Sequence, residues 1–165
     1  MDLNNQNTRY AYIQLLVDTL RKKFEVLSYL MDLTQEQESV IASDKFEEDE
    51  FLKLIEQKEE QLQSLNMLDT GFERIYESVK EELTLNKSKY QSEVIALKEY
   101  IGLITDLSVK TQALERRNKS KLEIVLAQKR KEIKNSRMSN QSVTNYYKTM
   151  AMQHEPQSYF YDKKK

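Results

Sequence analysis

The sequence predicts an all-α protein: an elongated antiparallel bundle of three long helices with coiled-coil-like seams, followed by a C-terminal amphipathic tail. Two Gly and one Pro occur among 165 residues, whereas a sheet protein of this size needs many turns that draw on those residues. Apolar side chains also recur in steps of three and four along three separate stretches, which is the spacing of helix seams. Hydrophobic residues make up only 39% of the chain, so the core is expected to be thin.

The first predicted helix covers 8–43, where the apolar steps alternate between four and three. The predicted seam consists of Ile13, Val17, Leu20, Phe24, Leu27, Met31, Thr34, Glu38 and Ile41, with Leu16 and Leu30 widening the stripe. At about 1.5 Å per residue, such a helix would be about 54 Å long.

The second predicted helix covers 45–84. Asp44 and Glu47 have the spacing of a capping box that would start it. Its predicted seam is Phe51, Ile55, Lys58, Leu62, Leu65, Asp69, Phe72, Tyr76, Val79 and Leu83. Gly71 follows Thr70 in a second possible capping box, but a single glycine costs only about 1 kcal/mol relative to Ala. We therefore expect this helix to continue through Gly71.

The third predicted helix covers 88–135 and opens at the capping-box pair Ser88 and Gln91. Its predicted seam is Tyr90, Val94, Leu97, Ile101, Ile104, Leu107 or Ser108, Thr111, Leu114, Asn118, Leu122 and Val125. This divides the chain into a helical bundle at 1–135 and a tail at 136–165.

The tail carries its apolar residues at helical spacing, which predicts a short amphipathic segment. These residues are Val143, Tyr146, Tyr147 and Met150. Pro156 would stop the segment, and three aromatic residues follow at 159–161. The tail either becomes ordered on a partner, as apolar mobile segments do, or folds back and completes the core of its own bundle.

Four polar residues fall at seam positions: Glu38, Lys58, Asp69 and Asn118. One interpretation is that the seam is frayed and solvated there. The other is that these groups pair across helices and fix the register of the bundle. The sequence leaves both open.

Composition argues against several classes of function. The chain has no Cys and one His, so no catalytic residue, metal site or bound cofactor is expected. Too few glycines are present for a phosphate-binding loop, and a net charge of −1 is unlike that of nucleic-acid-binding domains. No apolar run is long enough for membrane insertion and no signal segment is recognised, so we expect a cytoplasmic protein that is not an enzyme.

The pattern resembles the FlgN family of flagellar type III export chaperones. The similarity covers the Leu-rich first helix, 38–44 (Glu-Ser-Val-Ile-Ala-Ser-Asp), 51–62 (Phe-Leu-Lys-Leu-Ile-Glu-Gln-Lys-Glu-Glu-Gln-Leu), 114–119 (Leu-Glu-Arg-Arg-Asn-Lys), the pair Tyr146 and Tyr147 after Val143, and the closing 160–165 (Phe-Tyr-Asp-Lys-Lys-Lys). Nearly the whole chain takes part, and the similarity is one of helical pattern. The region 70–90 departs from it by being more continuous than in many members.

The resemblance implies an all-helical cytoplasmic chaperone without ATPase activity. It would hold hook-associated filament-junction proteins before export and deliver them to the export apparatus. Family members are associated with substrate binding through the C-terminal amphipathic region, which implies partner-binding roles here for Val143, Tyr146, Tyr147 and Met150. The alternatives are a structural coiled-coil scaffold and a regulatory adaptor, and a homodimer is compatible with each of them.

Overall fold

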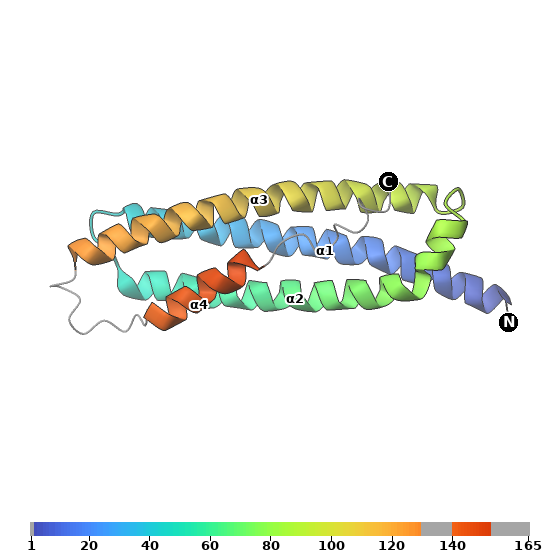
Figure 1. The fold of residues 1–165 in the computed structure, drawn as a ribbon, viewed down its shortest axis with the longest axis horizontal. Coiled ribbons are helices and arrows are strands. Elements are labelled where there is room, and N and C mark those ends of the chain that lie inside the picture. Colours follow the sequence, from blue (N-terminus) through green and yellow to red (C-terminus); the bar gives the residue numbers. More distant parts are fainter. Residues whose placement is uncertain (1, 130–139, 153–165) are drawn as a thin grey trace. The chain divides into compact units, whose positions relative to one another are not determined.

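The computed structural model describes residues 2–129 and 140–152, which form four helices and, within these ranges, no strand (Figure 1). The predicted all-α class is confirmed. The helices are α1 (Asp2–Ala42), α2 (Glu48–Leu85), α3 (Gln91–Gln128) and α4 (Asn140–Ala151). The predicted end of the third helix at 135 and the aromatic residues at 159–161 lie outside the described residues.

The helix starts differ from the predicted ones by a few residues. α1 begins six residues before position 8, in a polar stretch where no apolar rhythm could reveal a helix. α2 begins at Glu48 rather than 45, because the carbonyl of Glu47, not that of Asp44, accepts the first helical bond, from the Phe51 N–H at 3.2 Å. The predicted capping role of Asp44 is therefore wrong. Three acidic residues occupy the first turn of α2, where negative charge stabilises a helix start.

α3 begins at Gln91 rather than 88, and α2 is continuous through Gly71, as predicted. The hydroxyl of Thr70 donates to the carbonyl of Asn66 at 3.0 Å, four residues back, so it belongs to the helix and does not cap a new one. Just beyond, Phe72 and Tyr76 are buried with ring centroids 6.2 Å apart. Burial of these two rings outweighs the cost of one helical glycine.

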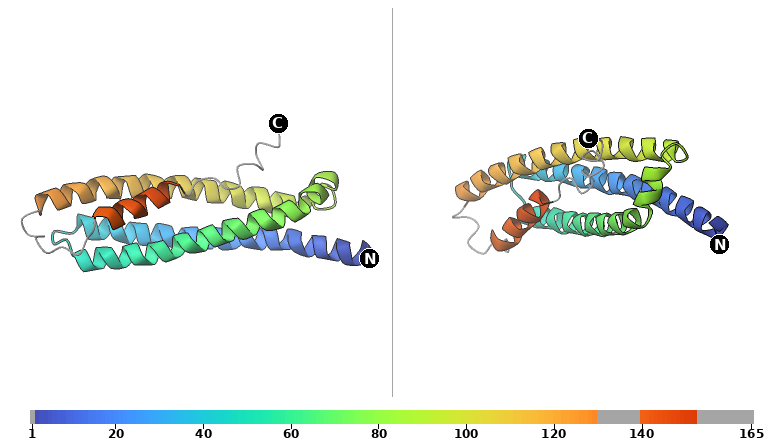
Figure 2. Two further views of the ribbon diagram at one scale, coloured as in Figure 1. Left: turned by 60° about the horizontal axis from the view of Figure 1, so that its bottom comes forward. Right: turned by 45° about the vertical axis from the view of Figure 1, so that its right-hand side comes forward.

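The described residues form two compact units, and each long helix contributes to both. Among the described residues, unit 1 contains 2–26 and 64–106, and unit 2 contains 27–63, 107–129 and 140–152. The helices labelled in Figure 1 can be followed through two further views in Figure 2.

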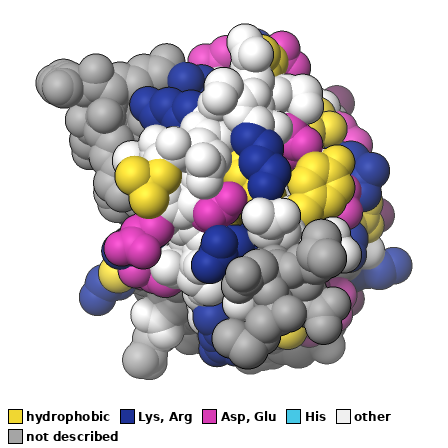
Figure 3. Space-filling model, turned by 90° about the vertical axis from the view of Figure 1, so that its right-hand side faces the viewer, with side chains coloured by type: hydrophobic (Ala, Val, Ile, Leu, Met, Phe, Trp, Pro, Cys, Tyr) yellow, Lys and Arg dark blue, Asp and Glu magenta, His cyan; other side chains and the backbone are white. Residues whose placement is uncertain are grey.

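Unit 1 consists of the first part of α1, the second part of α2 and the first part of α3. Its core is formed by apolar side chains from all three helices and by Tyr90, which directly precedes α3: Ile13, Leu16, Leu20, Leu65, Phe72, Tyr76, Val79, Leu83, Tyr90, Leu97, Ile101 and Ile104. Polar contacts at its margin connect the helices, and Lys23 pairs with Asp69 at 2.6 Å. On the face shown in Figure 3, basic and acidic side chains are interspersed and the hydrophobic ones lie in separate groups.

Unit 2 contains the remaining parts of the long helices and α4. Its apolar core is Leu27, Leu30, Leu33, Ile41, Phe51, Leu54, Ile55, Leu62, Leu114, Leu122, Tyr146, Tyr147 and Met150. The helix α4 therefore shares a core with the other three helices. The remaining described side chains of unit 2 are mostly half-buried or exposed.

The seams of α2 and α3 are close to those predicted, but the seam of α1 is displaced. The side chains of Leu16, Lys23, Leu30 and Gln37 are buried, whereas the residues after them, predicted as seam positions, are only half-buried. Where two neighbours such as Leu30 and Met31 are both apolar, either spacing fits the sequence. Lys23 and Gln37 are buried because each has a partner on another helix.

Candidate functional site

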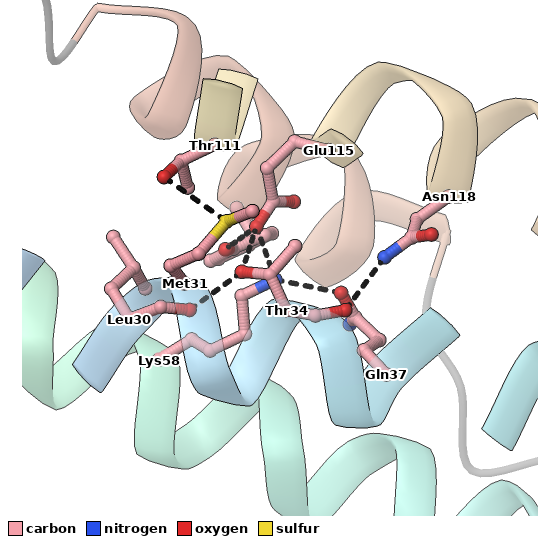
Figure 4. Close-up of polar contacts among 9 residues, drawn as sticks. Leu30, Met31, Thr34, Gln37, Lys58, Thr111, Glu115 and Asn118 are labelled. Carbon is pink, nitrogen blue, oxygen red and sulfur yellow. Dashed lines mark hydrogen bonds and ion pairs between the residues drawn. The ribbon is translucent and has the colours of Figure 1, made fainter. Parts of the chain in front are cut away.

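A buried polar network lies inside unit 2, centred on Lys58 of α2. The Lys58 side chain is 0% exposed, and its ammonium group forms an ion pair with Glu115 of α3. Lys58 Nζ also donates to Gln37 Oε1 of α1 at 2.6 Å (Figure 4). A buried charge is tolerated only when it is paired and hydrogen-bonded, and α1 and α3 together provide this.

Glu115 is the acceptor on which the four helices converge. Its Oε1 atom accepts from the Tyr146 hydroxyl of α4 at 2.7 Å and lies 2.9 Å from the Thr34 hydroxyl of α1. The Thr34 hydroxyl also lies 2.7 Å from the carbonyl of Leu30, so its single proton serves one acceptor at a time. Asn118 Nδ2 donates to the Thr34 carbonyl at 3.0 Å. The network therefore joins all four helices through one carboxylate.

Burial shifts the ionisation of the network. The pKa of Lys58 is lowered from 10.5 to about 8 by desolvation, which the charge of Glu115 only partly offsets. The pKa of Tyr146 is raised well above 10, mainly by burial and then by Glu115, so its hydroxyl remains a donor at neutral pH. The Lys58 ammonium also lies 4.6 Å from the centroid of the Tyr146 ring, an attractive cation–π geometry.

Of the four polar seam residues, Lys58 and Asn118 are fully buried and paired across helices. Asp69 pairs with Lys23, and Glu38 approaches Lys121 at 3.7 Å on the surface. Pairing between helices therefore describes these positions better than a frayed seam.

The predicted partner-binding residues lie together on one face of α4. Tyr146, Tyr147 and Met150 are buried in unit 2, and Val143 is half-buried beside them. Tyr146 and Tyr147 meet edge to face, with ring centroids 5.2 Å apart. Of the two alternatives for the tail, its described part folds back onto the bundle. The partner-binding role of these residues stays a prediction.

An open cleft of about 510 Å³ lies beside this face of α4, between α4 and α3. Tyr147 and Met150 contribute to its lining from α4, and Arg116 and Lys119 from α3. Tyr146, in contrast, points its hydroxyl into the network. One side of the apolar face of α4 therefore packs into the core of unit 2, and the other side lines the cleft.

Sequence reasoning missed Glu115 and Gln37, the two residues that receive the Lys58 ammonium. The available signal was Lys58 itself, because a lysine at a seam position requires an acidic partner. Glu115 lies next to the seam residue Leu114 and one helical turn before Asn118. Several acidic residues satisfy such spacing, so the sequence alone could not select this one.

The network holds charges in place and gives no access to a substrate, since both Lys58 and Glu115 are buried. Within residues 2–129 and 140–152, no group of three or more acidic or histidine side chains is arranged to hold a metal ion. None of the described helices has a stretch long and apolar enough to cross a membrane.

Fold and site together define a helical bundle with a charged, hydrogen-bonded core and an open cleft along its short helix. No protein-family model, curated protein or solved structure matches this chain.

Proposed function

We propose that this chain is a cytoplasmic export chaperone of the flagellar type III class that binds hook-associated proteins through α4 and the cleft beside it. It prevents their premature association and delivers them to the export apparatus. The proposal rests on the sequence resemblance to the FlgN family and on one structural observation. The four residues that the resemblance implies in partner binding gather on one helical face, and two of them, Tyr147 and Met150, border the cleft.

The geometry suits capture of a helix. Two helices with space between them form a groove in which an amphipathic helix of a partner can bury its apolar face. Tyr147 and Met150 are 7% and 3% exposed, so each presents only an edge to the cleft, beside the exposed Ala151. Such binding needs no nucleotide and no bond cleavage, because affinity comes from burying the adhesive segment of the client.

The test measures capture of purified hook-associated proteins by calorimetry. Met150→Ala and truncation after Asn140 are expected to weaken binding while leaving most of the far-UV helical signal. Met67→Ala is the matched control, because Met67 is 76% exposed in unit 1 and far along the sequence from the cleft. Unchanged affinity in the Met150→Ala variant and in the truncated chain would reject the α4 assignment.

Tyr146→Ala, which the same reasoning selects, removes a core side chain as well as a predicted binding residue, and so does Met150→Ala. The effect of each variant on capture should therefore be compared with its effect on unfolding. The coiled-coil scaffold and the regulatory adaptor make a different prediction, since neither requires a hook-associated client. A stable oligomer in sedimentation that captures none of these proteins would favour the scaffold.

A further inference from the structure

The cleft between α3 and α4 is cationic, although the chain as a whole has a net charge of −1. Arg116 and Lys119 enter its lining from α3 and Lys148 from α4, and all three are exposed. In the described part of the chain none of the three side chains forms an ion pair or hydrogen bond. The one acidic residue of the lining, Glu115, is buried and already paired with Lys58. The positive charge of the cleft is therefore not neutralised from within.

The two walls of the cleft have the spacing of helix faces. From α3 come positions 112, 115, 116 and 119, and from α4 come 144, 147, 148, 150 and 151. The α3 set follows steps of three, one and three, as do 144, 147, 148 and 151 of α4, and this spacing places residues on one side of a helix. Between the charged positions lie Tyr147, Met150 and Ala151. The cleft is thus an apolar floor between two basic walls.

Tyr147 is the aromatic residue in the lining of the cleft. Its side chain is buried, the residue being 7% exposed, and its hydroxyl has no hydrogen-bond partner in the described part of the chain. The hydroxyl oxygen is itself shielded from solvent, so it is the ring of Tyr147 that borders the cleft. A carboxylate is the group that the three neighbouring cations favour.

We propose that this cleft binds an acidic amphipathic helix of a partner protein, with its apolar face on Tyr147 and Met150 and its carboxylates between Arg116, Lys119 and Lys148. This inference rests on the proposed function, which it extends by naming the chemistry of the client segment. The apolar floor favours a peptide over a nucleic acid, whose backbone would leave that floor uncovered. The C-terminal residues 163–165 are all Lys, so they carry the same positive charge as the cleft and are not the acidic segment that it would bind.

The experiment uses two synthetic amphipathic peptides of about fifteen residues, a length at which isolated helices are marginally stable. Both have Leu at the i, i+3, i+4 and i+7 positions, and their polar face is glutamate in one and lysine in the other. Fluorescence anisotropy with the full chain should show binding of the glutamate peptide and about tenfold weaker binding of the lysine peptide. Affinity for the glutamate peptide should fall as salt rises.

A charge reversal in the cleft should reverse this preference. In the double variant Arg116→Glu, Lys148→Glu we expect about a tenfold loss of affinity for the glutamate peptide and tighter binding of the lysine peptide. Arg117→Glu is the matched control, because Arg117 is exposed, carries the same charge and points about 100° away from Arg116 around the helix. It does not line the cleft, so its affinities should equal those of the unchanged protein.

Several outcomes would overturn the inference. These are equal affinity of the unchanged protein for the two peptides, equal losses in the Arg116→Glu, Lys148→Glu double variant and in the Arg117→Glu control, competition by a single-stranded oligonucleotide, and a homodimer that the double variant dissociates in sedimentation. The same variants tested on hook-associated proteins separate the two proposals. Capture that the cleft reversal leaves unchanged would reject the acidic-helix inference alone. Cleft-dependent peptide binding without capture of any hook-associated protein would reject the chaperone proposal alone.

Discussion

Units 1 and 2 each place a lysine of a helix seam against a carboxylate on another helix, but they differ in how much water reaches the pair. In unit 1 the side chains of Lys23 and Asp69 are 6% and 20% exposed, and in unit 2 those of Lys58 and Glu115 are 0% and 4% exposed. Water can still solvate the carboxylate of unit 1. The carboxylate of unit 2 depends on protein donors, one of which comes from α4.

The comparison indicates why unit 2 includes a fourth helix. A lysine whose carboxylate partner still reaches solvent, as Asp69 does, leaves part of the solvation of that pair to water. A lysine at the centre needs a closed set of partners, because desolvation of each ion costs several kcal/mol. The Tyr146 hydroxyl and ring add to that set from outside the three long helices.

The largest expected effect comes from removing the buried cation. Lys58→Met should lower the free energy of unfolding by about 3–5 kcal/mol, because it leaves the Glu115 carboxylate and the Gln37 amide oxygen buried without the lysine nitrogen that contacts both. Lys23→Met should cost about 1–2 kcal/mol, since the carboxylate of Asp69 is partly hydrated. Urea unfolding followed by far-UV circular dichroism measures both.

A second substitution sharpens this difference. Glu115→Gln keeps an oxygen acceptor but removes the uncompensated charge, so adding it to Lys58→Met should restore part of the lost stability. If the two lysine variants lose the same free energy, the contrast between the units fails.

The pH dependence of stability should carry the signature of Lys58. Its pKa is about 8 when folded and 10.5 as the ordinary value, so between these values the unfolded chain binds more protons than the folded chain. Stability therefore rises with pH in this window, by about 2 kcal/mol towards pH 10. The lowered pKa of Lys23 acts in the same direction.

Above about pH 10 the slope of stability against pH changes sign. The pKa values of Tyr146 and Tyr147 are raised, mainly by burial, so there the folded chain retains protons that the unfolded chain loses, and stability falls. Thermal or urea unfolding across this range should show a maximum near pH 10. The rise below it should be smaller in the Lys58→Met variant, and an identical rise would show that Lys58 does not cause it.

The two neighbouring tyrosines of α4 offer a smaller, internally controlled test. Tyr146→Phe removes a hydrogen bond to a charged carboxylate and should cost about 1.5–2 kcal/mol. Tyr147→Phe removes a buried hydroxyl without a hydrogen-bond partner and should be neutral or slightly stabilising. Both variants retain the aromatic ring, so urea unfolding compares the hydroxyls alone. Equal losses of unfolding free energy would contradict the role assigned to the Tyr146 hydroxyl in the buried network.

The smallest expected effect lies in unit 1, at Gly71. A Cβ at this position would meet nothing within 4 Å, so Gly71→Ala should stabilise the chain by about 0.5–1 kcal/mol through higher helix propensity. Thermal unfolding would register this as a higher midpoint. A loss of stability would show that α2 needs the glycine, contrary to its continuous helix.

Much of the bundle was predictable because helical periodicity is a local property. The seam from Phe51 to Leu83 follows the predicted positions throughout, with only Asp69 less than buried. In α1, every second predicted seam position lies one residue after the residue that is actually buried. Phe24 was preferred to Lys23, for example, because it is more apolar and nothing nearby in the sequence favours burying a lysine. Helix starts were misplaced by a few residues because several polar residues in each connection could cap a helix.

The sequence by itself determined the helical class, the three long amphipathic helices and the clustering of the α4 apolar residues, since each follows from the spacing of neighbouring residues. Only the tertiary structure decided that Lys58 meets Glu115, that Tyr146 completes their network, and that Arg116, Lys119 and Lys148 border one cleft. These pairings join residues far apart in the chain, and many alternative partners have the same local pattern. The choice among them depends on which side chains become buried together, and therefore on the desolvation cost that each pairing must offset.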